Sequence, residues 1–222
     1  MANPTYSAMA RVFAVVLPVA GVGALIGGKF AHRFVGEQLA AEAITMPDIE
    51  TIERELKIGL VTAEDAELLR PHAGVTLSTG PQARAYADNY VLAHMRVAAR
   101  QSGVPDDQAT YAGVGDLAAA KNRELKAELR ERNPGLSPAE VNLLAKAEVA
   151  DPETEFEAAR EIKALYELRS DNFFMGNAIR GMLLNAYGWW LVGLIARIAG
   201  LALVGVGALL AAIGFRTGGR ND

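Results

Sequence analysis

The sequence predicts an all-α protein in which two antiparallel transmembrane helices flank an extramembrane domain of about five to seven helices. The two spans are predicted by long apolar segments, one near each end of the chain. Between them lie repeated helix-start signals and no convincing alternation of apolar and polar residues, so we expect no β-sheet. With 222 residues, of which 51% are hydrophobic, the chain has room for both spans and one further domain.

The first apolar segment is an uncharged run from Val12 to Gly28, bounded by Arg11 and Lys29. We expect residues 1–11 to form a tail and residues 12–28 to form the first transmembrane helix. The run is short for a crossing of about 20 residues, but the apolar stems of flanking side chains extend it. A cleaved signal peptide is the alternative, but the run has no persuasive small-x-small cleavage site followed by a polar start.

The second apolar segment runs from Gly181 to Phe215, and its only charged side chain is Arg197. We expect residues 179–215 to form one long helix that crosses the membrane over about 190–215, with the tryptophan pair at headgroup level. The alternative is a hairpin that turns at Arg197 and crosses twice. That turn would have neither proline nor asparagine.

Small residues recur every seven positions in both segments, which places them on one face of each helix. In lipid, small residues favour helix association because they let the backbones approach closely. We therefore expect the two helices to pack glycine to glycine, either within one chain or across a dimer. The predicted packing residues on this register are Ala14, Gly21, Gly28, Gly193, Gly200, Gly207 and Gly214, and Gly23 with Gly27 adds a GxxxG pair.

Residues 29–178 are expected to form the helical domain, and their charge is strongly negative. Between Phe30 and Ala178 lie 25 of the 26 acidic residues and 16 of the 22 basic ones, a net charge of −9. Such a surface repels nucleic acid, so we expect no nucleic-acid partner. The chain has no cysteine, which excludes disulfides and thiolate metal sites.

The first part of this domain consists of short helices. A helix over Phe34–Ile44 should continue from the first span and end at Met46 and Pro47. A charged helix is expected over Asp48–Lys57, and Thr62 should cap the next one. The segment Val75–Leu77 is too short to be more than a connector.

A longer helix follows the capping box formed by Thr79 and Gln82. Tyr86, Tyr90 and His94 lie on one stripe of it, since they are spaced by four residues. The stripe is either ligand-facing, with His94 as a proton donor or lone metal ligand, or the core face of the helix.

After this helix ends near Gln101, a further one is expected over Gly115–Glu131. Its large apolar residues are Leu117, Leu125 and Leu129 alone. So narrow a stripe predicts a solvated, peripheral helix.

Two more helices should complete the domain. Ser137 and Glu140 form a second capping box, which opens a helix to about Val149. Asp151, followed by proline, is expected to cap a last helix that ends at Arg169 before the chain enters the second apolar segment.

Residues 79–90 with His94, and residues 180–190, resemble the two best-marked segments of a family of small, functionally uncharacterised actinobacterial membrane proteins. The resemblance implies one span near each end with a helical domain between them, and it implies no activity. No cofactor or metal is expected, because His32, His72 and His94 are scattered along the chain, whereas a metal centre needs converging ligands.

Two functional hypotheses follow. The first is a non-enzymatic accessory or scaffold component of the cell membrane, which binds the lipid bilayer and other membrane proteins or a second copy of itself. The alternative is a site for a lipid or quinone built from Tyr86, Tyr90, His94 and Arg197. No catalytic motif stands out, so an enzyme is the less favoured class. The basic C-terminal tail, 216–222, is typical of a cytoplasmic end and favours an extracytoplasmic domain.

Overall fold

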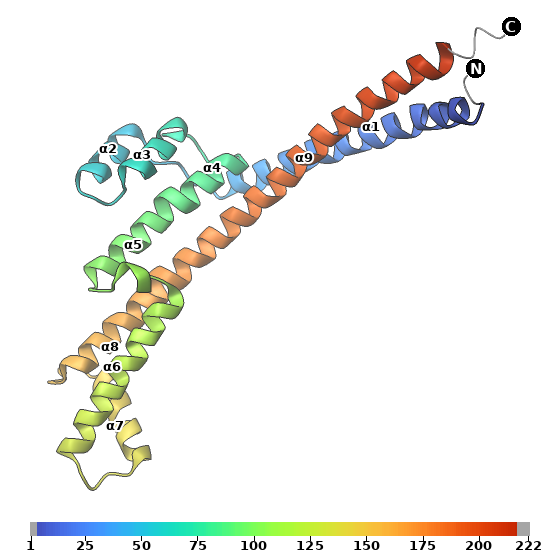
Figure 1. Cartoon of the computed structure of the whole chain (residues 1–222). Helices are drawn as coiled ribbons and strands as arrows, with labels where there is room; N and C mark the ends of the chain where they lie inside the picture. Colours follow the sequence, from blue (N-terminus) through green and yellow to red (C-terminus); the bar gives the residue numbers. More distant parts are fainter. Residues whose placement is uncertain (1–3, 217–222) are drawn as a thin grey trace. The chain divides into compact units, whose positions relative to one another are not determined.

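The computed structural model describes residues 4–216, and the chain divides into two compact units that we describe separately. Within the described residues, the paired-helix unit comprises 4–46, 74–84 and 183–216, and the helical unit comprises 47–73 and 85–182. The elements, of which Figure 1 labels the α-helices, are α1 (Pro4–Ala41), α2 (Ile49–Lys57), α3 (Ala63–Leu69), η1 (Arg70–His72), α4 (Gly80–Ala85), η2 (Tyr86–Val91), α5 (Leu92–Gln101), η3 (Asp106–Gln108), α6 (Tyr111–Arg132), α7 (Pro138–Ala150), α8 (Glu157–Glu167), η4 (Leu168–Phe174) and α9 (Met175–Arg216).

The predicted all-α class is confirmed. The described residues contain no β-strand, and their one extended pairing is an isolated bridge between Thr45 and Thr76. Two of the short elements, η2 and η4, are π-helical turns within longer helices. Two helices are long and apolar enough to cross a membrane, over Ala8–Ala41 and Glu157–Gly214.

The helix α9 runs without interruption through Arg197, so the prediction of one long helix is confirmed and the hairpin alternative is wrong. A single arginine does not end a helix, since its helix propensity is high and the segment contains no proline. The helix α1 begins at Pro4, inside the segment predicted as a tail, and carries Pro18 in its interior. Of the predicted C-terminal tail, residues 217–222 lie outside the described part of the chain.

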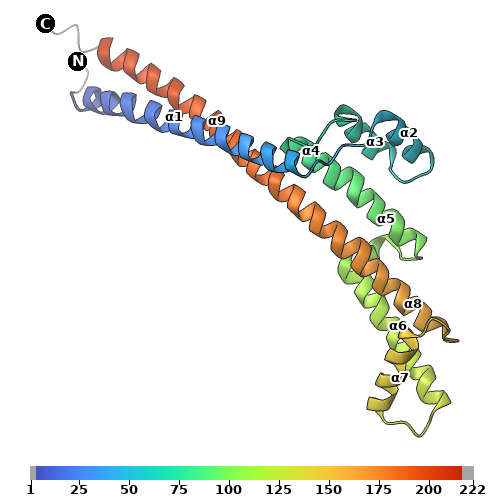
Figure 2. The ribbon, with the colours of Figure 1, turned by 180° about the vertical axis from the view of Figure 1, so that it is seen from behind.

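The helices α1 and α9 pack along each other in the paired-helix unit (Figures 1 and 2). A Cβ atom added to Gly21 would lie 2.7 Å from the carbonyl oxygen of Gly200. A Cβ added to Gly28 would lie 2.5 Å from the carbonyl oxygen of Gly193. These distances leave no room for a side chain, so glycine is required where the two backbones meet.

The connector at 75–77 and the start of α4 complete the paired-helix unit. The Met46 N–H donates to the Val75 carbonyl at 2.9 Å, and the Leu77 N–H donates to the Ile44 carbonyl at 2.8 Å. The predicted capping box is confirmed, because the side-chain carbonyl of Gln82 accepts from the Thr79 N–H at 3.0 Å. These bonds hold the start of α4 beside the end of α1.

The helical unit is held together by two clusters of buried apolar side chains. The first contains Met95, Ala99, Val104, Val114, Ala118, Leu165, Leu168 and Phe173. The second contains Leu125, Leu129, Val141, Ala145, Phe156, Ala159 and Ile162. Both clusters draw on α6 and α8, so these two helices form the centre of the unit.

The prediction that 115–131 forms a peripheral helix is wrong. The helix α6 buries Val114 and Ala118 together with two of its leucines, at helical spacing. A count of large apolar residues alone misses this face, because valine and alanine also belong to it. Their small side chains let α8 approach closely.

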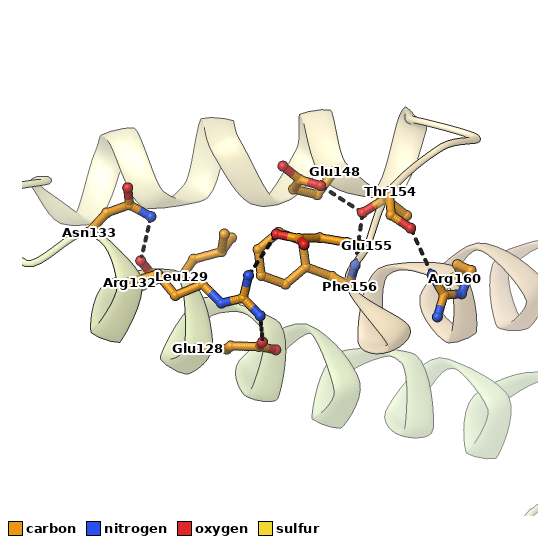
Figure 3. Close-up of polar contacts among 9 residues, drawn as sticks. All are labelled: Glu128, Leu129, Arg132, Asn133, Glu148, Thr154, Glu155, Phe156 and Arg160. Carbon is orange, nitrogen blue, oxygen red and sulfur yellow. Dashed lines mark hydrogen bonds and ion pairs between the residues drawn. The ribbon is translucent and has the colours of Figure 1, made fainter.

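The predicted start of the last helix at Asp151 is also wrong. Asp151 instead ends α7, since its N–H donates to the Ala147 carbonyl at 2.9 Å, and α8 begins at Glu157. The Thr154 hydroxyl donates to Glu148 at 2.6 Å, and Arg160 donates to the Thr154 carbonyl at 2.7 Å (Figure 3). These bonds fix an ordered loop where the sequence favours a helix start.

The same loop delivers Phe156 to the second cluster. The guanidinium of Arg132 lies 4.5 Å from the centre of the Phe156 ring and also binds Glu128 and Glu155, each at 2.7 Å (Figure 3). The break expected between Arg169 and the second apolar segment is absent from the described chain. There, η4 continues α8 directly into α9, because a wider π-helical turn absorbs the Ser170–Asn172 segment.

Candidate functional site

The paired-helix unit contains a polar node between α1 and α9, formed by His32, Trp190 and Arg197. The His32 imidazole stacks on the Trp190 indole, with ring centres 4.6 Å apart and an interplanar angle of 1°. Its Nε2 lies 2.8 Å from the Trp190 carbonyl oxygen, and its Nδ1 lies 3.2 Å from Nη1 of Arg197. A carbonyl only accepts and a guanidinium only donates. The imidazole is therefore neutral, with its proton on Nε2, and both ring nitrogens are bonded.

The start of α4 closes this node from another side. A Cβ added to Gly80 would lie 2.6 Å from two atoms of Trp190, so the backbone of α4 rests on the indole. Arg84 donates from Nη1 to the Tyr187 hydroxyl at 3.2 Å, and its guanidinium lies 5.3 Å from the centre of that ring. The segments 79–84 and 183–190 therefore meet at Gly80 and Trp190.

Most of the predicted packing residues line the α1–α9 contact. Besides the two glycine pairs already described, Gly207 packs against Pro18, and a Cβ added to Gly214 would lie 3.6 Å from the Arg11 side chain. Ala14 is buried as well. Gly23 and Gly27 behave differently, because a Cβ added to either would meet nothing within 4 Å. The structure therefore leaves this GxxxG pair out of the α1–α9 contact.

The helical unit contains the second candidate site, a cluster of Glu55 with Tyr86, Tyr90 and His94. The three predicted stripe residues lie side by side, with ring centres 5.0 Å apart for Tyr86 and Tyr90 and 4.4 Å apart for Tyr90 and His94. Glu55 of α2 faces this stripe. Its Oε1 accepts from the Tyr90 hydroxyl at 3.3 Å, and its Oε2 lies 3.7 Å from His94 Nε2.

Glu55 is the member of this candidate site that sequence analysis missed. It is 7% exposed, although α2 is a short, highly charged helix. Glu55 lies three residues after the buried Ile52, which places it on the apolar face of α2, and that spacing was the available signal. A buried carboxylate needs partners, and the stripe supplies a donor to one of its oxygens, the Tyr90 hydroxyl at Oε1.

Burial raises the pKa of Tyr90 to about 12, and the nearby carboxylate of Glu55 adds to this rise. Burial and then the same carboxylate also raise the pKa of Tyr86. Both phenols therefore keep their protons at neutral pH. Tyr90 acts here as a hydrogen-bond donor to Glu55, the role that buried tyrosine hydroxyls commonly have.

The four residues predicted to bind a ligand fall in different units. Tyr86, Tyr90 and His94 come together in the helical unit, whereas Arg197 belongs to the node of the paired-helix unit. The contacts of the stripe with α2 favour the core-face interpretation over the ligand-facing one. Within residues 4–216, no group of three or more histidine, aspartate or glutamate side chains is placed to hold a metal ion.

A bidentate contact fixes η2, which carries Tyr86 and Tyr90. Arg180 donates from Nε to the Ala87 carbonyl at 3.0 Å and from Nη2 to Asp88 at 2.9 Å. Arg180 comes from the part of α9 that lies in the helical unit. π-helical turns are frequent at functional sites. The anchored turn η2 therefore supports the cluster around Glu55 as a candidate site.

A small pocket of about 200 Å³ lies in the helical unit at the α7–α8 connection. Its walls carry both charge signs, and Arg160 is already bound to the Thr154 carbonyl. Comparison with known proteins adds no assignment to either site: no protein-family model, no curated protein and no solved structure matches the chain.

Proposed function

We propose that this chain is an integral membrane protein that acts as a non-enzymatic accessory or scaffold component, with α1 and α9 crossing the bilayer as an antiparallel pair. The observation that carries the proposal is the backbone-to-backbone contact of glycines. Gly28 meets Gly193, Gly21 meets Gly200, and Pro18 meets Gly207, so residue numbers fall along α1 as they rise along α9. Contact through small residues is how helices associate in lipid, where apolar burial adds no driving force.

The outward faces of both helices support the same proposal. Large apolar side chains on these faces remain exposed in the chain, and much of each apolar window is unburied. Such a surface in water would be an aggregation hazard, whereas lipid solvates it. The exposed residues include Val12, Val15, Val16, Val19, Val22 and Ile26 on α1 and Val192, Ile195, Ile198, Leu201, Val206, Leu209 and Ile213 on α9.

The node at Trp190 suits the boundary between hydrocarbon and water. Tryptophan is enriched at that depth, and Lys29 and Arg33 flank His32 on α1. An arginine inside the hydrocarbon costs about 2.5–3.5 kcal/mol on insertion scales, and a hydrogen-bond partner reduces the penalty. Arg197 has such a partner in His32.

The scaffold role is supported by a surface of α1 that the α1–α9 contact does not use. Gly23 and Gly27 form a smooth surface on α1 that points away from α9, where a helix of another membrane protein or of a second copy can approach. The helical unit then lies on the extracytoplasmic side, in line with the basic C-terminus.

The membrane part of the proposal is tested by fractionation. Membranes from cells that express the full chain are washed with alkaline carbonate and sedimented. We expect the protein in the pellet and its release by detergent alone. Recovery in the aqueous fraction would overturn the membrane assignment.

Topology is tested with single cysteines introduced into this cysteine-free chain. A membrane-impermeant maleimide should label Ser102→Cys in intact cells and should label Thr217→Cys only after lysis. The reverse pattern would place the helical unit in the cytoplasm while leaving the two spans intact.

The scaffold part is tested by photo-crosslinking in native membranes. A photoreactive residue at Ile26, 66% exposed on α1, should yield adducts with a second membrane protein or a second copy. A second photoreactive position of similar exposure is Leu143 on α7, 67% exposed, which samples partners of the helical unit instead of the apolar helices. Absence of protein adducts from both positions would contradict a scaffold.

A further inference from the structure

The Glu55–His94 contact in the helical unit leaves one proton to be assigned. Nδ1 of His94 lies 2.8 Å from the Tyr90 carbonyl oxygen. A carbonyl oxygen only accepts hydrogen bonds, so Nδ1 must carry a hydrogen. In a neutral imidazole the other nitrogen, Nε2, is then a bare acceptor.

That bare nitrogen faces another acceptor. Nε2 of His94 lies 3.7 Å from Oε2 of Glu55, and this oxygen is buried with no hydrogen-bond donor among the described residues. A bridging water bonded to both atoms would hold them about 4.5 Å apart, which is wider than the contact seen. Without an added proton, a lone pair of the imidazole would therefore point at a buried carboxylate.

The neighbouring charges do not remove this conflict. On α2, Arg54 donates to the Thr51 hydroxyl at 3.2 Å. On α3, the carboxylate of Asp65 binds the Thr62 N–H and hydroxyl, at 3.0 and 2.6 Å. On η2, the Tyr90 hydroxyl satisfies Oε1 of Glu55, and Tyr86 stacks behind it. Within the described chain, His94 is the cation-forming group that reaches Glu55.

We propose that Glu55 and His94 together bind one proton, and that this proton latches α2 onto the η2–α5 helix. With the proton present, an imidazolium N–H faces the carboxylate and the buried oxygen is paired. When the proton leaves, two acceptors face each other in a buried site, and separation lets water solvate Glu55. The latch lies within the helical unit and does not depend on the membrane assignment.

The direction of the pH effect follows from proton linkage. The latched form binds a proton that the open form holds less tightly, so acid favours the latch and rising pH releases it. Hydrogen exchange of the α2 amides, Ile49–Lys57, reports the opening locally. The full chain in detergent micelles is compared at about pH 5.5 and about pH 8, which bracket a free histidine.

We expect α2 protection, corrected for intrinsic exchange, to fall about tenfold between the two pH values in the wild-type chain. Glu55→Gln and His94→Gln should each abolish this difference, because an amide group donates or accepts without an added proton. The matched control is His72→Gln in the same unit, which should keep it. A wild-type protection that is equal at both pH values, or a difference that survives in both variants, would overturn the latch.

A second measurement needs no variant to fold. Long-range ¹⁵N correlation spectra of the wild-type chain report the tautomer of each of its three histidines. At about pH 8, with the shared proton released, we expect an Nδ1–H imidazole for His94, because Nδ1 lies 2.8 Å from the Tyr90 carbonyl oxygen. An Nε2–H imidazole would place a donor toward Glu55 without any extra proton, and the proposal would fail.

Discussion

The two units of this chain pack helices in opposite ways. Between α1 and α9 the backbones themselves meet, and a single added carbon at Gly21 or Gly28 would collide with a carbonyl oxygen. In the helical unit side chains meet instead, and the buried clusters combine large residues such as Phe173 and Leu125 with alanines such as Ala118. One chain thus packs helices through glycine backbones in one unit and through interlocking side chains in the other.

The difference follows from the solvent, water or lipid, that surrounds each surface before the helices pack. In water, burying a large apolar side chain gains about 1.5–3 kcal/mol, so a soluble core selects bulk. In lipid the surroundings are as apolar as leucine, and what remains is close dispersion contact between backbones. The composition of each contact therefore favours an aqueous setting for the helical unit and the proposed lipid setting for the α1–α9 pair.

The largest effect that sharpens this comparison is expected in the aqueous core. Replacing Phe173, 1% exposed, with alanine should lower the free energy of unfolding of the helical unit by about 3–5 kcal/mol, because it leaves a cavity. Denaturant unfolding of the full chain in detergent, followed by circular dichroism, measures this. The neighbouring Phe174 is 61% exposed, and Phe174→Ala should cost less than about 1.5 kcal/mol. Equal costs would contradict the assigned core.

The next effect concerns the glycine contact. Gly28→Leu should destabilise the α1–α9 pair by about 1–3 kcal/mol or more, because its Cβ would meet the Gly193 backbone. Gly27→Leu is the matched control on the same helix, since nothing lies within 4 Å of its Cβ. Thermal unfolding in detergent separates the two variants. A larger loss at Gly27 would mean that α1 packs through its other face.

Sequence patterns predicted the paired helices better than the helical unit. The seven-residue recurrence of Gly21 and Gly28 marks a packing face directly, because no other residue type tolerates that approach. The predicted helix start at Asp151 failed because a local N-cap pattern does not show where the preceding helix ends. Its N–H was taken by the last turn of α7, and the burial of Phe156 decided where α8 begins.

The candidate sites show the same limit. Helical spacing placed Tyr86, Tyr90 and His94 on one face, but their partner Glu55 comes from a helix that no local pattern connects to them. Arg197 was predicted to share a lipid or quinone site with the stripe, and the structure pairs it with His32. A Cβ added to Gly193 would meet the His32 ring, and one added to Gly28 would meet the Arg197 side chain, so both side chains flank the same glycine pair.

A third prediction compares the two partners of the polar node. His32→Leu should cost about 2 kcal/mol, because it leaves the Arg197 guanidinium without its acceptor in an apolar setting. Arg197→Leu should cost less than about 1 kcal/mol, since it removes the charge along with the bond. Adding Arg197→Leu to His32→Leu should then restore stability. Equal single costs and no recovery in reversible unfolding would argue that the node lies in water.

The smallest effect tests the phenol that serves the buried carboxylate. Tyr90→Phe should lower the free energy of unfolding near neutral pH by about 1 kcal/mol, because Oε1 of Glu55 loses its donor. The variant should also change the alkaline response. The raised pKa of Tyr90, about 12, means that the folded chain holds this proton more tightly than the unfolded chain.

Its contribution is therefore complete below about pH 10 and is lost as the pH rises from 10 toward 12. Tyr90→Phe removes this loss, so its unfolding free energy should fall less steeply in that range than that of the wild type. Part of the slope should remain, because burial also raises the pKa of Tyr86. Tyr166→Phe, at a tyrosine 46% exposed on α8, is the control and should leave the wild-type slope unchanged. If Tyr90→Phe and Tyr166→Phe change the slope equally, Tyr90 is not the donor that holds Glu55 in the helical unit.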